Sequence, residues 1–582
     1  MATNEALSRM DDISQCAARA ERHRQQVTLV ALSGIFAVLA VRDLVRFSLG
    51  DPLGFGFHLP SLSSPFAPAF VLMLILGAML VLPMLGLGRS PHVMVRPGDV
   101  EFSMDDLLGS VRLKEGLTEL IEEYRHFATL EREHGGKPPR AVLFEGPPGT
   151  GKTMAAKVLA RESGVPFLFV SASSFQSMYY GQTSRKLRSF FRHLRRLTRR
   201  YGGAIGFIEE FDSIGASRAG LGPGSGREGV AGVVGELLVQ LQSFEVRRWS
   251  IDRILHRAVP RDEIEPRFLL LAATNRASDL DPALIRPGRF DRIVRFELPS
   301  KPSRTAIIDG LLERRSSQSG AVVDRETIEL VASMSSGMSQ AGLNRLIEEA
   351  SILAWRHGGG MTKDDLCAAL SRVSLGTIDP IRFDDAQRLR IAVHEVGHAF
   401  YTWRRSTMSK VGLVSILKRS SALGLTAMYQ PDDAPLVLRS ELIEVIASSL
   451  GGMAAEELFL GEPSTGSSSD LRAATERAFE YLTTYGLGEY LNVVGTLDRT
   501  QYAALLLGEG PLRDEVNRLL GEAKARVSEL LHEEADLVWK LILRLLSQDE
   551  LDEAELRELL GPPRIDAEGV GSIDLDGLYL PR

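Results

Sequence analysis

The chain has 582 residues and a mass of 63.8 kDa, so it is too long for a single hydrophobic core and predicts about three or four structural units. A net charge of -7 and a pI near 6.0 argue against a general nucleic-acid-binding protein. The two cysteines, Cys16 and Cys367, stand far apart, which excludes a disulfide framework and a cysteine zinc site and fits a reducing compartment.

Two apolar segments near the N-terminus predict a transmembrane hairpin. Residues 66–88 carry no charge, and 23 residues are enough to cross a hydrocarbon core of about 30 Å as a helix. The earlier run, residues 27–41, is long enough only if it continues through Arg42 and Arg46. The alternatives for this first run are a signal-peptide core or an amphipathic surface helix.

The charges around these runs predict the orientation of the hairpin. The stretch between the runs, residues 48–65, has only Asp51 and His58 as ionisable residues. Arginines lie outside both runs instead, at Arg9, Arg19, Arg22, Arg24, Arg89 and Arg96. This bias places both ends of the hairpin in the cytoplasm, although Arg42 and Arg46 count against it.

A glycine-rich loop follows a short apolar strand at residues 141–144 and leads into a helix at residues 154–162. The loop consists of Gly146, Pro147, Pro148, Gly149, Thr150, Gly151, Lys152 and Thr153. Its backbone N–H groups suit phosphate oxygens, its lysine adds a charge on the β and γ phosphates, and its last threonine offers a hydroxyl to Mg²⁺. The loop therefore predicts an ATP site.

Polar residues after two further apolar strands complete this prediction. The strand at residues 204–208 ends in Glu209, an acid for Mg²⁺, and Glu210, which is placed to polarise the attacking water. The strand at residues 268–273 leads to Asn275, either a sensor of the γ phosphate or a plain turn residue. Further on, Arg286 and Arg289 suit a clamp on a neighbouring subunit's phosphate, or else form a solvated face.

Together these segments, in this order, resemble the AAA+ ATPases, a resemblance that implies an α/β P-loop module with a helical lid and a hexameric ring. In that family an aromatic loop grips polypeptide in the central channel, and Tyr179 and Tyr180 occupy the matching place. Two adjacent tyrosines also fit a core strand. The chain departs from the family at Glu209, where aspartate is usual, and in a long charged stretch at residues 245–267. The extra methylene of Glu209 predicts a displaced magnesium shell and slower hydrolysis.

Downstream, the sequence HEVGH predicts a metal helix. Residues His394 and His398 are four apart and share one helical face, which allows both imidazoles to hold one zinc ion, while Glu395 faces the bound water as general base. Two hydrogen-bonded histidines on a surface helix are the alternative. The candidate third ligand is Asp470, which opens a helix expected at residues 471–482 and also fits an N-cap.

The segments at residues 450–458 and 464–471 resemble the FtsH family of membrane-bound ATP-dependent zinc metalloproteases. The resemblance implies zinc on His394, His398 and Asp470 with Glu395 as base, and makes Glu456 and Glu457 candidates for supporting the ligands. Two short strands expected within residues 411–428 form an edge that, in this family, holds substrate by strand addition.

The predicted fold is multidomain, with a transmembrane helical hairpin, an α/β P-loop AAA+ module with a helical lid, and a mainly α-helical zinc metalloprotease domain. The predicted boundaries are 1–26 for a cytoplasmic N-terminal segment, 27–88 for the hairpin with a short external loop, 89–300 for the large ATPase subdomain, 301–376 for the lid, 377–561 for the protease and 562–582 for a tail.

The HEVGH motif prepares water for hydrolysis, and the glycine loop belongs to a module that extracts work from a nucleotide. Their presence on one chain predicts a machine that uses ATP to feed a protease. We expect a membrane-anchored homohexamer with Zn²⁺, ATP and Mg²⁺ that unfolds and processively cuts membrane and cytoplasmic proteins. We expect it to bind no nucleic acid. We also expect its membrane to be the bacterial inner membrane, with both catalytic domains in the cytoplasm. The alternatives are a membrane chaperone or remodelling ATPase with little proteolysis, and a zinc peptidase whose motor is defective at Glu209.

Overall fold

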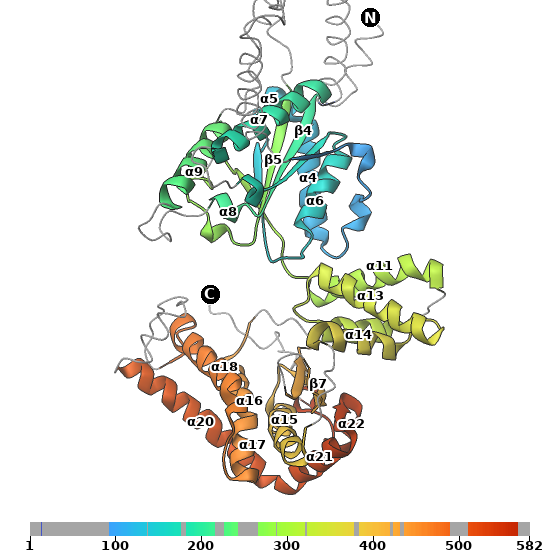
Figure 1. Cartoon of the computed structure of the whole chain (residues 1–582), viewed down its shortest axis with the longest axis vertical. Coiled ribbons are helices and arrows are strands. Elements are labelled where there is room, and N and C mark those ends of the chain that lie inside the picture. Colours follow the sequence, from blue (N-terminus) through green and yellow to red (C-terminus); the bar gives the residue numbers. More distant parts are fainter. Residues whose placement is uncertain are drawn as a thin grey trace, which may run out of the picture. The chain divides into compact units, whose positions relative to one another are not determined.

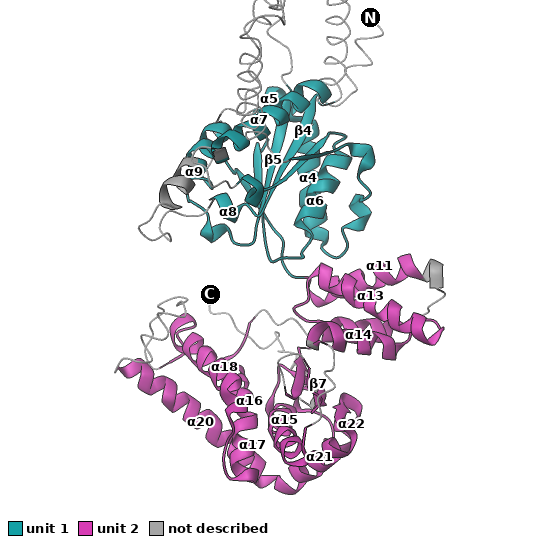
Figure 2. Ribbon diagram, viewed as in Figure 1, with its two compact units in different colours: residues 1–298 teal, residues 299–582 magenta. Residues whose placement is uncertain are grey.

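The computed structural model describes Ile13 and much of residues 92–567, in the segments 92–136, 138–175, 182–215, 226–242, 266–286, 288–319, 323–376, 383–419, 423–430, 436–488 and 510–567. The expected membrane hairpin, Tyr179 and Tyr180, and most of the charged stretch at residues 245–267 lie outside these segments. Within them, no helix is both long and apolar enough to span a bilayer. The chain divides into two compact units, Met1–Leu298 and Pro299–Arg582 (Figures 1 and 2).

The first unit is built on a six-stranded sheet in the order β1-β3-β4-β5-β2-β6, in which only the β1–β3 pair is antiparallel. The strands are β1 (Val93–Val95), β2 (Ala141–Glu145), β3 (Phe167–Ser171), β4 (Gly203–Glu209), β5 (Arg267–Thr274) and β6 (Arg292–Arg295). The three apolar runs expected as strands are β2, β4 and β5, which lie side by side within the sheet.

Helices cover both faces of this sheet, which is why the strands inside it are apolar at successive positions (Figure 1). Along β5, Phe268, Leu270 and Ala272 belong to one core, and Leu269, Leu271 and Ala273 to the other. The first core includes α7 (Gln182–Tyr201), α8 (Asp212–Gly215) and α9 (Gly226–Gln242); the second includes α4 (Val111–Arg125), α5 (Phe127–Glu133) and α6 (Lys152–Glu162). The parallel strands β2, β4 and β5 end at the same edge, where the glycine loop follows β2, Asn275 follows β5, and Glu209 is the last residue of β4.

The second unit begins with four helices in the region expected as the lid. They are α11 (Lys301–Ser319), α12 (Arg325–Met334), α13 (Gln340–His357) and α14 (Lys363–Leu375). Capping fixes their ends: the Ser339 side chain accepts a hydrogen bond from Gly342 N at the start of α13, and Thr362 and Asp365 form a reciprocal capping box at the start of α14.

The remainder of this unit is mainly helical, as expected. Its helices are α15 (Asp385–Arg405), α16 (Arg439–Ser449), α17 (Gly451–Leu460), α18 (Ser468–Phe479), a π-helical turn (Glu480–Thr484), α20 (Pro511–Glu533), α21 (Ala535–Gln548), α22 (Glu553–Leu560) and α23 (Arg564–Ala567). The central helix is α15, whose residues 395–403 are all buried. The last short helix, α23, lies inside the stretch expected as a tail.

A three-stranded sheet in the order β8-β7-β9 packs beside α15 (Figure 1). The two strands expected near the metal helix are β7 (Lys410–Ser415) and β8 (Leu425–Tyr429). The third, β9 (Glu550–Asp552), pairs antiparallel with β7 from far along the chain and was not expected. Since β7 is the central strand, β8 keeps one edge unpaired within the described residues.

Candidate functional site

The glycine loop brings Lys152 against its own backbone. Its Nζ donates to Gly146 O at 2.6 Å and Pro147 O at 2.8 Å, and to Asn275 Oδ1 at 3.2 Å. Burial lowers the pKa of Lys152, and the charges of Glu209 and Asp212 act against this decrease. The structure therefore brings Asn275 to the loop, although the two are 123 residues apart in sequence.

The two acids at the end of β4, Glu209 and Glu210, have different partners. The hydroxyl of Thr153 donates to Glu209 Oε1 at 2.5 Å, so the extra methylene of glutamate leaves this carboxylate in contact with the threonine expected to bind Mg²⁺. The backbone of Glu210 is left-handed, with φ +54°, and its Oε2 accepts from Ser171 Oγ at 3.2 Å. This conformation costs a non-glycine residue about 1 kcal/mol or more.

The two candidate arginines lie in the loop between β5 and β6. Arg289 donates to Ala283 O, and Arg286 is exposed. With a single chain described, their expected contact with a neighbouring subunit stays a prediction, as does the channel role of Tyr179 and Tyr180.

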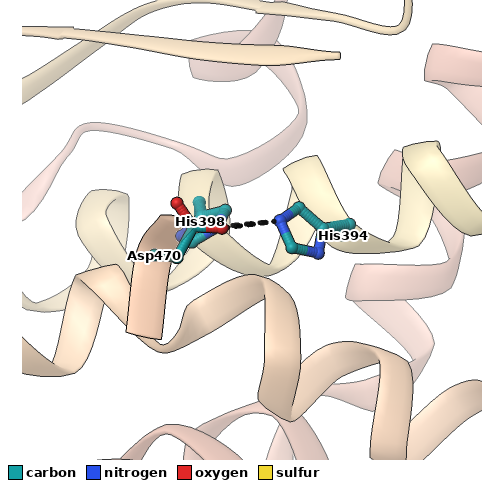
Figure 3. A group of neighbouring side chains, drawn as sticks. All are labelled: His394, His398 and Asp470. Atoms are coloured by element: carbon teal, nitrogen blue, oxygen red, sulfur yellow. Dashed lines mark hydrogen bonds and ion pairs between the residues drawn. The ribbon is translucent and has the colours of Figure 1, made fainter. Parts of the chain in front are cut away.

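In the second unit, His394, His398 and Asp470 converge (Figure 3). One ligand atom from each lies within 4.8 Å of the other two. The Nε2 of His394 is 3.2 Å from Asp470 Oδ2 and 3.2 Å from His398 Nε2, and the His398–Asp470 separation is 3.6 Å. The aspartate lies in the first turn of α18, which begins at Ser468, and not at its N-cap as the alternative had it.

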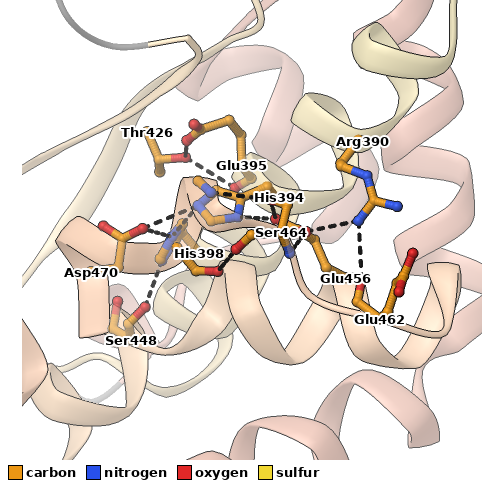
Figure 4. A network of polar contacts seen from close by, with 12 residues as sticks. Arg390, His394, Glu395, His398, Thr426, Ser448, Glu456, Glu462, Ser464 and Asp470 are labelled. Atoms are coloured by element: carbon orange, nitrogen blue, oxygen red, sulfur yellow. Dashed lines mark hydrogen bonds and ion pairs between the residues drawn. The ribbon is translucent and has the colours of Figure 1, made fainter. Parts of the chain in front are cut away.

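The other nitrogen of each imidazole is held from behind. His394 Nδ1 is 2.7 Å from Glu456 Oε1, and His398 Nδ1 is 2.7 Å from Ser448 O (Figure 4). Because the acceptors occupy Nδ1, both Nε2 atoms point toward Asp470. The other candidate for this support, Glu457, bonds Lys524 Nζ instead at 2.6 Å.

The charges of His394 and Asp470 shift each other's pKa. Burial alone would lower the pKa of His394, but its hydrogen bonds with Asp470 and Glu456 outweigh burial and raise that pKa to about 10. Burial would raise the pKa of Asp470, yet its contacts with the two histidines hold that pKa below its usual value. A metal ion that binds His394 must therefore displace a proton.

The carboxylate of Glu395 lies beside the ligands and is 8% exposed. Its Oε2 accepts from Thr426 Oγ1 at 2.8 Å, and the same hydroxyl is 2.9 Å from Glu395 O (Figure 4). Burial raises the pKa of Glu395 despite the nearby histidines. A glutamate with a raised pKa and a fixed orientation is suited to proton transfer.

Glycines allow α15 and α17 to cross at the site. A Cβ on Gly397 would lie 2.3 Å from Gly451 O, and one on Gly451 would lie 2.7 Å from Gly397 O. This close crossing brings α17 beneath His394, where a Cβ on Gly452 would lie 2.4 Å from the ring's Cε1. The small residue between the two histidines is thus required by helix packing.

The donor set fits zinc. Two imidazole nitrogens and one carboxylate oxygen are ligands that Zn²⁺ accepts, and three protein ligands are the number found in catalytic zinc sites. Acceptors on both Nδ1 atoms provide the outer support that such ligands need. In the other unit, the lysine, threonine and acid around the glycine loop suit a nucleotide with Mg²⁺.

Comparison with known proteins gives two family matches. The family model described as "ATPase family associated with various cellular activities (AAA)" matches residues 142–298, and that of "Peptidase family M41" matches residues 381–559. An "ATP-dependent zinc metalloprotease FtsH 3" from Sphaerobacter thermophilus is 36% identical over 490 residues, which cover 82% of this chain and 91% of that protein. The chain belongs to the FtsH family.

Two further relatives carry similar names. "ATP-dependent zinc metalloprotease FtsH 2" of Sphaerobacter thermophilus is 32% identical, over 81% of this chain and 68% of that protein. "ATP-dependent zinc metalloprotease FtsH 3" of Conexibacter woesei is 33% identical, over 82% of this chain and 61% of that protein. The resemblance drawn from the motifs is therefore confirmed.

A cavity of about 1200 Å³ in this FtsH-family chain opens onto the metal ligands and Glu395. Strand β8 lines it with Leu425, Thr426, Met428 and Tyr429. The edge of β8 is unpaired in the part of the chain that the structure describes, and Thr426 of the same strand holds the candidate base.

Three contributors to the site escaped the sequence reasoning. Thr426 is one polar residue in a short strand, Ser448 acts through its backbone carbonyl, and Arg390 contacts Glu456. Only Arg390 left a signal, because it lies one helical turn before His394 on the same face.

Proposed function

We propose that this FtsH-family chain is a membrane-anchored, ATP-dependent zinc endopeptidase that unfolds proteins and cuts the threaded chain. The observation that carries the proposal is the convergence of His394, His398 and Asp470 beside Glu395. The same chain carries a nucleotide loop whose Thr153 contacts Glu209, the last residue of β4. A remodelling ATPase has no need of the first arrangement, and a simple peptidase has no need of the second.

In peptide hydrolysis the residues of the chain have two tasks, which are to bind the metal ion and to transfer protons. His394, His398 and Asp470 hold the metal ion. A bound zinc ion supplies Lewis-acid chemistry that activates water for attack on a peptide carbonyl. Glu395 accepts the proton of the attacking water and delivers it to the leaving amine nitrogen. Thr426 keeps this carboxylate oriented through its hydrogen bond of 2.8 Å.

Substrate enters the site in extended form along β8. The edge of this strand that is unpaired within the described segments offers backbone hydrogen bonds that do not depend on sequence, which suits a protease with many substrates. The cavity beside β8 receives the alternate side chains of the bound segment.

ATP hydrolysis uses the other unit. Lys152 binds the β and γ phosphates, Thr153 and Glu209 hold Mg²⁺, and Glu210 polarises the attacking water. The remaining assignments are the loop residues 146–151 as the phosphate cradle, Asn275 as the γ-phosphate sensor, Arg286 and Arg289 as a clamp on the neighbouring subunit's nucleotide in a homohexamer, and Tyr179 and Tyr180 as the channel aromatics.

The membrane assignment rests on the uncharged run at residues 66–88 and on the arginine bias around it. It places the motor and protease on the cytoplasmic side of a bacterial inner membrane, facing membrane and cytoplasmic protein substrates. Carbonate extraction of cell membranes tests it: recovery of the full chain in the soluble fraction would refute an integral membrane protein.

A degradation assay tests the enzymatic proposal. With casein and ATP, we expect hydrolysis that is lost with a zinc chelator, restored by added zinc, and lost in Glu395→Gln. Activity unaffected by Glu395→Gln would refute the peptidase assignment. In parallel, Glu210→Gln should abolish ATP turnover. A wild-type turnover no higher than that of this variant would favour the peptidase with a defective motor, and brisk turnover without casein cleavage would favour the chaperone.

A further inference from the structure

The carboxylate of Glu456 joins three segments behind the metal ligands. It is 1% exposed and accepts from four groups. Oε1 faces His394 Nδ1 at 2.7 Å and Ser464 Oγ at 3.0 Å, and Oε2 faces Ser464 N at 2.6 Å and Arg390 Nη1 at 3.0 Å (Figure 4). We call Arg390, Glu456 and Ser464 the carboxylate junction.

The junction also controls the chain that leads to the third ligand. Arg390 Nη1 donates a second time, to Glu462 O at 3.0 Å. Ser464 lies in the same turn, which connects α17 to α18, and its backbone N–H and side-chain hydroxyl both donate to Glu456. Asp470 is only six positions after Ser464, so the position of this turn fixes where α18 begins.

Charge balance gives Arg390 a particular part. A buried carboxylate without a cation is costly, and Arg390 is the permanently charged donor among its four contacts. An imidazole that holds a metal through Nε2 is neutral, so His394 then donates an ordinary N–H to Glu456. In that state Arg390 supplies the positive charge that balances the Glu456 carboxylate.

We infer that Arg390 is a positioning residue for the metal centre: it holds the buried Glu456 carboxylate and the turn at residues 462–464 together, and so sets both His394 and Asp470 for zinc. This inference rests on the proposed zinc site. Arg390 touches neither substrate nor metal. Loss of such outer support typically costs about 10- to 100-fold in metal affinity.

The chain offers a closely matched control. Two residues earlier on α15, Arg388 Nη2 donates to a carboxylate, Asp549 Oδ1 at 2.7 Å, and to a carbonyl, Leu546 O at 2.9 Å. Its side chain is 33% exposed and that of Arg390 is 34% exposed. The two arginines therefore have the same kinds of partner on one helix, but only Arg390 contacts the junction.

The experiment measures zinc affinity of the metal-free, full-length chain by competition with a chromophoric chelator. We expect Arg390→Met to weaken zinc binding about 10- to 100-fold and Arg388→Met to leave it within about twofold of wild type. Thermal unfolding of the two metal-free variants should be similar. Unchanged affinity in Arg390→Met, or an equal loss in Arg388→Met, would overturn the inference.

Two further variants separate positioning from folding. Arg390→Lys keeps a cation near Glu456 and should recover most of the affinity lost in Arg390→Met, because both acceptors lie within reach of one nitrogen. Ser464→Ala removes one hydrogen bond from the other side of the junction and should weaken zinc binding about tenfold even if Arg390→Met does not fold. Wild-type affinity in Ser464→Ala would count against the inference. Failure of the wild type to bind zinc would refute the proposed function itself.

Discussion

A single methyl group at Gly452 should disable the metal centre while leaving the helices intact. A Cβ there would lie 2.4 Å from Cε1, 2.5 Å from Nε2 and 2.6 Å from Nδ1 of His394. Carbon atoms in ordinary contact are about 3.5 Å or more apart, so the ring must move by about 1 Å. Metal–ligand distances tolerate only about 0.2 Å. The ring therefore cannot stay in place for zinc in Gly452→Ala.

The size of the effect follows from the cost of overpacking, about 1–3 kcal/mol. If the metal site bears this cost, zinc affinity falls roughly 5- to 150-fold, since about 1.4 kcal/mol corresponds to a factor of ten. Alanine also favours a helix more than glycine does, so loss of α17 is not expected. Casein cleavage should fall with zinc occupancy, and ATP turnover, which belongs to the other unit, should persist.

The assay is zinc titration of the full-length chain against a chromophoric chelator, with Gly521→Ala as the control. Gly521 lies in α20, and a Cβ there would meet no atom within 4 Å. This control should keep wild-type zinc affinity and gain a little stability. Wild-type affinity in Gly452→Ala, or an equal loss in both variants, would show that the ring position does not depend on the space at Gly452.

Two other substitutions test the contacts of the acids. Glu209→Asp withdraws the carboxylate from Thr153 Oγ1, which Glu209 contacts at 2.5 Å. Because a hydrogen bond to a charged group contributes about 1.5–3 kcal/mol, Mg²⁺-dependent ATP turnover should fall about tenfold or more. Equal or faster turnover would mean that the longer side chain impairs hydrolysis. Thr426→Val removes the hydroxyl that donates to Glu395 at 2.8 Å and changes the shape of the side chain little. The peptidase kcat should therefore drop about tenfold at unchanged zinc content. Loss of zinc or an unchanged kcat would contradict the assigned role.

The sequence was most informative where function requires residues at a fixed local spacing. The pair His394 and His398 lies on one helix, and the glycine loop lies between a strand and a helix, because those geometries are set within a few residues. Asp470 was the candidate third ligand, which the family resemblance assigned to zinc, and the structure brings it to the histidines. The apolar runs at residues 141–144, 204–208 and 268–273 were visible as strands because both faces of the sheet are covered.

What the sequence did not predict depends on contacts between distant segments. Glu456 and Glu457 are neighbours in sequence, but successive helical residues face different directions, so one meets His394 and the other Lys524 of α20. Strand β9 has three residues and pairs with β7 from 135 to 139 residues away, a contact that no local pattern reports. The support of His398 comes from a backbone carbonyl, which has no residue type of its own.

The extra methylene group of Glu209 predicted a displaced magnesium shell at the ATP site. Its carboxylate reaches Thr153 in spite of that length, so a displaced shell does not follow from side-chain reach alone. The left-handed backbone of Glu210 was not predicted either, since nothing in the residue type favours it.

The unequal anchoring of the two metal histidines has an evolutionary consequence. His394 leans on a side chain, Glu456, so point mutations at Glu456, Arg390 or Ser464 can strengthen, weaken or retune that ligand. His398 leans on the main chain at residue 448, which every amino acid supplies. Substitutions can therefore change the support of one imidazole, while the other is protected from direct loss of its acceptor.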